Sequence, residues 1–187
     1  TSNGYQSFYS NTTGHSNAAT GYHALYSSTT ASYNTANGLQ ALYSNTTGQY
    51  NTAFGSRALY SQTTGNYNDA IGYEAGYNTT SGIKNTLLGH AAGYSNTTAS
   101  HNVFVGANSW QDTTTGQTNV AVGSSALANN TTASNNTAVG YQAGYSNTTG
   151  NSNVFIGQAA GQNTTSANNT FIGVNSGDLV TSGQKNT

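Results

Sequence analysis

Cysteine, proline and methionine are absent from this sequence, and only 4% of its residues are charged. Without cysteine the chain can form neither disulfides nor thiolate metal sites. Three Lys and Arg residues and a net charge of −1 leave no basic track for phosphates. The longest apolar runs, such as Val103–Val105, are too short to cross a bilayer. We therefore expect no nucleic-acid partner and no membrane span.

Gly, Asn, Thr and Ser dominate what is present, a composition often found in disordered chains. Two features oppose disorder. The 14 Tyr and 5 Phe recur at fixed intervals, and disorder normally accompanies a high net charge. The sequence therefore indicates a regular, ordered repeat.

A period of 17 residues runs through the chain. It is anchored by Gly4, Gly21, Gly38, Gly55, Gly72, Gly89, Gly106, Gly123, Gly140 and Gly157. Gly173 follows after 16, which indicates one residue lost near Ala167–Asn168. Residues 1–187 are predicted to be a single repeat array. Because the sequence opens inside one repeat and stops at the start of another, we expect a segment of a longer chain.

Seventeen residues are too few for a helical-hairpin repeat, and Gly and β-branched residues oppose helix. They fit one coil of a parallel β-solenoid, a β-roll or β-helix. We expect two strands of four or five residues and two tight turns in each coil. About eleven coils, stacked about 4.8 Å apart, would make an all-β rod roughly 50 Å long.

Stacking places equivalent residues in columns, which we number from the anchor Gly as position 0. Position −4 is Asn in every coil, and its amides can bond along the column. This ladder is Asn17, Asn34, Asn51, Asn68, Asn85, Asn102, Asn119, Asn136, Asn153 and Asn169. Position −2 holds Ala, Leu or Phe, and position +3 holds Ala or Ser. These two columns are predicted to form a narrow interior.

Position −1 changes along the chain. It is polar at Thr20 and Asn37 and then becomes apolar at Phe54, Ile71, Leu88, Val105, Val122, Val139, Ile156 and Ile172. Alternation along a strand turns this column away from position −2. An exposed apolar column is expected to be buried against another surface, and a second copy of the chain is the simplest candidate. Three copies would bury the column along a common axis. A Tyr column at +5, from Tyr9 to Tyr94, suits a half-exposed seam.

The core Asn-Thr-Ala-Val-Gly of Asn136 to Gly140, with Ala143 three residues later, resembles the head repeats of trimeric autotransporter adhesins. The run from Asn37 to Gly48 is similar to repetitive tail-fibre shafts. The resemblance covers the whole chain. It implies a left-handed parallel β-roll, a homotrimer, and an adhesive or spacer function. The adhesin unit is shorter, so its strand and turn lengths do not transfer.

No set of residues has the spacing of a catalytic or metal centre. His15, His23, His90 and His101 fall in four different columns, and Asp69, Glu74, Asp112 and Asp178 are scattered likewise. We therefore expect no enzyme activity, no metal site and no cofactor. Arg57 and Glu74 share position +2 in adjacent coils, which predicts an exposed ion pair between coils.

The Thr-Thr pair at +8 and +9 has three interpretations. Its hydroxyls can satisfy backbone groups of a turn. A Thr array could instead order water and bind ice, although adjacent Thr side chains point to opposite faces. The pair also completes N-glycosylation sequons on a predicted outer turn. The sequon residues are Asn11, Asn45, Asn78, Asn96, Asn130, Asn147 and Asn163.

Together these features predict a structural or adhesive fibre segment, with an ice-binding β-solenoid as the alternative. We expect self-association, either as a homotrimer or end to end, and binding to a host surface or glycan receptor. The expected location is extracellular, on a cell surface or a virion.

Overall fold

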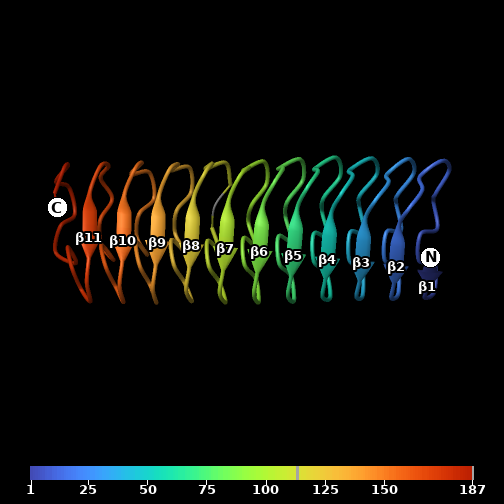
Figure 1. Ribbon diagram of the computed structural model, residues 1–187, viewed down its shortest axis with the longest axis horizontal. Helices are drawn as coiled ribbons and strands as arrows, with labels where there is room; N and C mark the ends of the chain where they lie inside the picture. Colours follow the sequence, from blue (N-terminus) through green and yellow to red (C-terminus); the bar gives the residue numbers. More distant parts are fainter. Residues whose placement is uncertain (113, 187) are drawn as a thin grey trace.

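The computed structural model describes residues 1–112 and 114–186. Each coil contributes one short strand to a single sheet, in which the strands follow one another in sequence order (Figure 1). The strands are β1 (Ser2–Asn3), β2 (Ala18–Thr20), β3 (Thr35–Asn37), β4 (Thr52–Phe54), β5 (Asp69–Ile71), β6 (Thr86–Leu88), β7 (Val103–Val105), β8 (Val120–Val122), β9 (Thr137–Val139), β10 (Val154–Ile156) and β11 (Thr170–Ile172).

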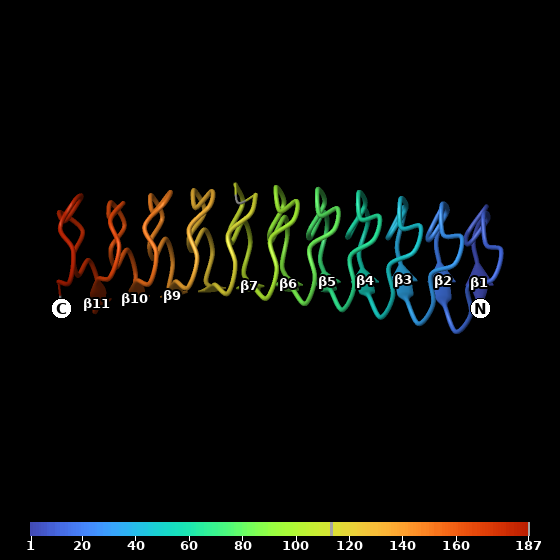
Figure 2. The same cartoon turned by 90° about the horizontal axis from the view of Figure 1, so that it is seen from above.

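All neighbouring strands are parallel and pair residues one repeat apart, as Ala36 pairs with Ala53 and Asn37 with Phe54. The strands lie along one side of an elongated rod, and turns make up the rest of each coil (Figure 2). The prediction of an all-β parallel solenoid with a 17-residue coil is confirmed. The prediction of two strands of four or five residues per coil is wrong, because each described coil has one strand of two or three residues.

Left-handed backbone at positions +2 and +4 explains why no second strand forms. Gln40 and Leu42 have φ of 55° and 52°, for example, and the pattern recurs along the chain. Extended strand geometry requires negative φ. The turn is nevertheless bonded to its neighbours, since the N–H of Leu42 donates to the carbonyl of Ala58 at 3.0 Å. The backbone groups of the turn are thus satisfied without a regular ladder.

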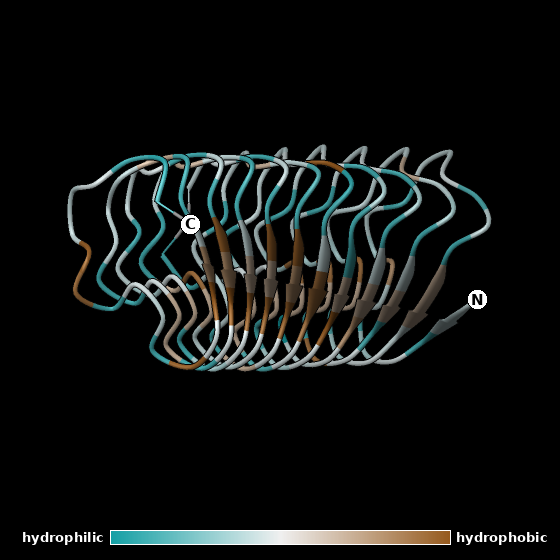
Figure 3. Cartoon of the chain, turned by 60° about the vertical axis from the view of Figure 1, so that its left-hand side comes forward, coloured by the Kyte–Doolittle hydropathy of each residue, from teal (hydrophilic) through white to brown (hydrophobic). Residues whose placement is uncertain are grey.

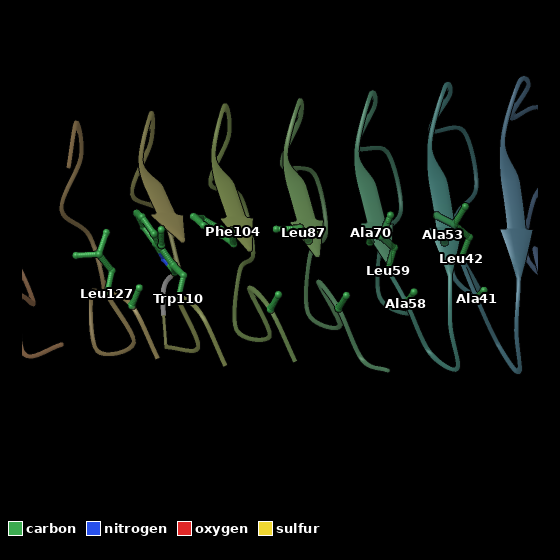
Figure 4. Close-up of a cluster of buried hydrophobic side chains, with 14 of the residues drawn as sticks. Ala41, Leu42, Ala53, Ala58, Leu59, Ala70, Leu87, Phe104, Trp110 and Leu127 are labelled. Carbon is green, nitrogen blue, oxygen red and sulfur yellow. The ribbon is translucent and has the colours of Figure 1, made fainter. Parts of the chain in front are cut away.

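The apolar core contains three columns rather than two. Positions −2 and +3 are buried as predicted, from Ala19 and Ala24 onward. Position +4 is buried as well, where Leu25, Leu42, Leu59 and Leu127 have no exposed surface. Figure 4 shows Leu42 beside the strand residue Ala53 and Leu59 beside Ala70. The left-handed residues turn both +3 and +4 inward, which strict alternation of faces does not allow.

Side-chain volume is shared between positions −2 and +4. Leu59 lies where the strand residues Ala53 and Ala70 are small. Where the next strand carries Leu87, position +4 is Gly76, and a Cβ there would approach the Leu87 Cδ1 to 2.5 Å. The same exchange puts Gly144 beside Phe155. A constant interior volume keeps every coil to the same cross-section.

The predicted Asn ladder is present and buried. The Asn51 N–H and Nδ2 both donate to the Oδ1 of Asn34, at 2.9 and 3.0 Å. The same Nδ2 donates to the carbonyl of Gly65 at 3.0 Å. Each amide therefore ties its own coil to the previous coil and closes its own turn. Equivalent bonds recur along the chain and continue to Asn186.

The shortened coil retains this ladder. The Asn169 N–H donates to the Asn153 Oδ1 at 2.8 Å across 16 residues. Thr165 still bonds the carbonyl of Thr181, and the Ser166 carbonyl accepts from Asn153 as position +10 does elsewhere. The missing residue therefore belongs between Thr165 and Ser166, at position +9, slightly before the predicted location. An exposed turn residue is lost without disturbing the interior.

Candidate interaction surfaces

The outer face of the sheet carries the predicted apolar column at position −1, hereafter the outer stripe, Phe54 to Ile172. Most of its side chains are exposed, with values of 44% for Phe54, 46% for Ile71 and 38% for Ile156. Val105 and Val122 are half-buried by their neighbours. Figure 3 shows the strands toward the C-terminus as a largely hydrophobic band against mostly hydrophilic turns. The predicted outward orientation of this column is confirmed.

The apolar surface extends beyond position −1. In the C-terminal half Val103, Val120 and Val154 add a second apolar column at −3 on the same face. In the N-terminal coils, where Thr20 and Asn37 occupy −1, exposed Tyr22 and Leu39 lie two residues further on. These contributions were not predicted, because they lie in columns other than −1. Exposed apolar side chains therefore accompany the sheet beyond the outer stripe, although polar residues such as Thr20, Asn37 and Asp69 stand among them.

The Tyr column at +5 forms a continuous stack. Successive rings from Tyr9 to Tyr94 lie 5.0–5.4 Å apart, with interplanar angles of 3–7°. The rings are half-buried except at the end, where Tyr9 is 63% exposed. Stacked rings of this kind contribute about 0.5–1.5 kcal/mol per pair beyond burial. The predicted half-exposed seam is confirmed.

A second, unpredicted stack lies at position +12. Tyr33, Tyr50 and Tyr67 are exposed, and their ring centroids are 4.9 and 5.0 Å apart. His23 joins the aromatic surface of the first coils, since its ring lies 3.8 Å from that of Tyr22 and its Nε2 is 2.8 Å from the Gln6 Oε1. The spacing of 17 between the three tyrosines could have revealed the second stack.

The predicted ion pair between coils is formed. Arg57 Nη1 lies 3.2 Å from Glu74 Oε1. The hydrogen bond with Glu74 raises the pKa of Arg57 above its usual value. The interaction of the Tyr73 hydroxyl with the Glu74 carboxylate is the main cause of the raised pKa of Tyr73. All three groups lie at the surface, so the pair is a local cross-brace between two coils.

The threonines at +8 hold the turns together. Nine of them donate their Oγ1 proton to a +8 carbonyl of the next coil, as Thr46 does to Thr63 at 3.1 Å. This geometry confirms that the stacked hydroxyls satisfy backbone groups. The residues at +9, such as Thr47 and Thr132, are exposed. A single exposed column of Thr is left on this edge.

Four of the predicted glycosylation sites are wrongly placed. Asn45, Asn96, Asn130 and Asn147 have no exposed surface, because position +7 faces the interior and closes its own turn. The Asn147 Nδ2 donates to the Gly150 carbonyl at 2.8 Å, and the Gly150 N–H donates to the Asn147 Oδ1 at 2.9 Å. The other three residues differ. Asn11 and Asn78 are half-buried and Asn163 is exposed, with its amide bonded to Asp178.

Acidic and His side chains do not gather anywhere in residues 1–112 and 114–186 into a group of three or more that could hold a metal ion. In the same two stretches there is no helix long and apolar enough to cross a membrane. The surface is therefore defined by its periodic columns. Comparisons with protein-family models, with curated proteins and with solved structures find no match for this chain.

Proposed function

We propose that the chain is a segment of an extracellular structural or adhesive fibre in which copies associate laterally through the outer stripe. The observation that carries this proposal is the outer stripe, which is apolar without a break over eight of the eleven strands, from Phe54 to Ile172. An exposed apolar surface that extends along most of a molecule is rare on a monomer and typical of an interface. A homotrimer would bury the stripe of each copy along one axis.

The remaining columns suit presentation and adhesion. Stacked Tyr rings recur in successive coils from Tyr9 to Tyr94, and a second stack joins Tyr33, Tyr50 and Tyr67. A repeated array gives many weak contacts at once, and their combined avidity can exceed each affinity by orders of magnitude. A cell surface or a virion is the setting in which such a rod would extend and contact a host receptor or glycan.

Lateral association is tested by measuring the mass of the intact chain by sedimentation equilibrium. We expect an oligomer that dissociates when Val122, Val139 and Ile156 are all replaced by Thr. Threonine preserves β-branching, so the strands remain compatible with the fold while the stripe becomes polar. As a matched control, Thr98, Thr132 and Thr149 at +9 are replaced by Ser, and the mass should not change. A monomeric parent chain that folds as a rod would refute lateral association.

Ice binding is the second function we keep, and it has less support. The +8 hydroxyls donate to carbonyls of the next coil, so they are not free to donate to water. The sheet offers Thr at −3, as at Thr35, Thr52 and Thr86, beside apolar residues. A thermal-hysteresis measurement separates the two functions. A freezing point lowered below the melting point would favour ice binding, and coincident values would remove it.

A further inference from the structure

The N-glycosylation sequons of the chain begin at three positions of the coil. At +7 the acceptor Asn closes its own turn and is buried in most coils, as in Asn45 and Asn147. At +6 the acceptors Asn78 and Asn129 are half-buried, and the hydroxyls of their sequons, on Thr80 and Thr131, donate to the next coil. The sequons Asn135-Asn136-Thr137 and Asn168-Asn169-Thr170 both begin at position +12. Each meets the Asn-X-Thr rule with a middle residue other than Pro.

Position +12 turns its side chain to solvent. Asn135 and Asn168 have left-handed φ of 60° and 62° and are exposed. In other coils the same column carries Tyr33, Tyr50 and Tyr67, whose rings are 44–53% exposed. A bulky group is therefore already accommodated at this position without any change in the coil.

The side chains that would react at these two sites have no hydrogen bonds to break within the described parts of the chain. Neither the side-chain amide of Asn135 nor that of Asn168 makes a hydrogen bond within the described parts of the chain. The sequon hydroxyls of Thr137 and Thr170 are likewise unbonded and lie on the outer face of β9 and β11. By contrast, the exposed Asn163 donates its Nδ2 to Asp178 at 2.8 Å, and that bond would have to break.

We propose that Asn135 and Asn168 are the acceptor sites for N-linked sugar on the folded rod. The donor is a hexose activated as a nucleoside diphosphate. The Asn Nδ2 attacks the anomeric carbon, an N–C bond forms, and the bond from that carbon to the diphosphate oxygen breaks. The nucleoside diphosphate leaves with the bonding pair, and the amide proton passes to solvent. The buried +7 sequons are closed to the same reaction while the coil is folded.

The test uses the intact folded chain, UDP-glucose and a soluble N-glucosyltransferase, with peptide mapping by mass spectrometry. We expect hexose at Asn135 and Asn168 and none at Asn45 or Asn147. Thr137→Val and Thr170→Val should each abolish modification at one site. Valine already occupies this column at Val120 and Val154, so these variants should retain the native fold and the other site serves as an internal control.

Two results would overturn the assignment. One is an unmodified folded chain when the same enzyme modifies a peptide that spans Asn135. The other is hexose at Asn147 in a chain whose circular dichroism shows the native fold. Because Thr137 and Thr170 lie on the sheet face that carries the outer stripe, the first result is judged on the triple Thr variant of the stripe, which leaves that face uncovered whether or not the parent chain associates laterally. The two proposals therefore fail independently.

Discussion

At the scale of single residues, the fold depends on left-handed backbone at positions that are often not glycine. Each coil has four such positions, at 0, +2, +4 and +12. At position 0 only Gly is possible, because Gly72 has φ of 142° and a Cβ there would collide with the Gly89 carbonyl. At the other positions ordinary L-residues adopt φ near 50–60° at a cost of roughly 1–2 kcal/mol each. The ladders and the core must offset that cost.

Thr118 is the residue least suited to this conformation. It is β-branched and has φ of 58°, while Asn135 takes the same position in the next coil with φ of 60°. Because Asn tolerates left-handed backbone and β-branched residues do not, we expect Thr118→Asn to raise the free energy of unfolding by about 1 kcal/mol. The free energy of unfolding is measured by urea denaturation monitored by circular dichroism. Thr132→Asn, at an exposed site without positive φ, should have little effect, and equal gains in both variants would contradict this explanation.

At the scale of the coil, the strand side was predictable and the turn side was not. Alternation of faces places Ala36 inside and Asn37 outside, as the strand has them. The same rule fails for Leu42 and Asn45, both buried, because left-handed residues reverse the chain between them and the strand. The sequence nevertheless contained a pattern that indicates the buried position +4. Leu and Gly replace one another there, and this is expected where a left-handed residue faces a core of limited volume.

That exchange of volume makes a coupled prediction. Leu87→Ala alone should destabilise the chain by about 3 kcal/mol, and Gly76→Leu alone should overpack the core by about 1–3 kcal/mol. Combined, they recreate the packing of Leu59 against Ala53 and Ala70. We therefore expect the double variant to lose less free energy of unfolding than the two single variants lose together, by at least about 1 kcal/mol. Combining Gly76→Leu with the distant Leu127→Ala is the control and should give additive losses. Additivity in both pairs would mean that the two columns do not share volume.

At the scale of the whole molecule, each coil contacts mainly its two neighbours, so stability is expected to build up coil by coil. Contacts between neighbouring coils run along the long axis of the rod: hydrogen bonds of the Asn ladder and of the Thr hydroxyls, and stacking of the Tyr rings. The side chains of the outer stripe take no part in these contacts, and most of them are exposed on the side of the rod. The stacking of the coils in register and the position of the stripe were predictable from the period of 17. The contributions of Tyr22 and Leu39 were not, because they belong to a neighbouring column.

The most direct test of lateral association uses the absence of cysteine. Val139→Cys gives the chain a single thiol in the outer stripe, and Thr132→Cys gives it one at exposed position +9. Non-reducing electrophoresis after mild oxidation then measures disulfide-linked pairs. If copies pack through the stripe, Val139→Cys should cross-link rapidly at low protein concentration and Thr132→Cys should remain largely unlinked. Equal, slow cross-linking of both variants would contradict lateral association through the outer stripe.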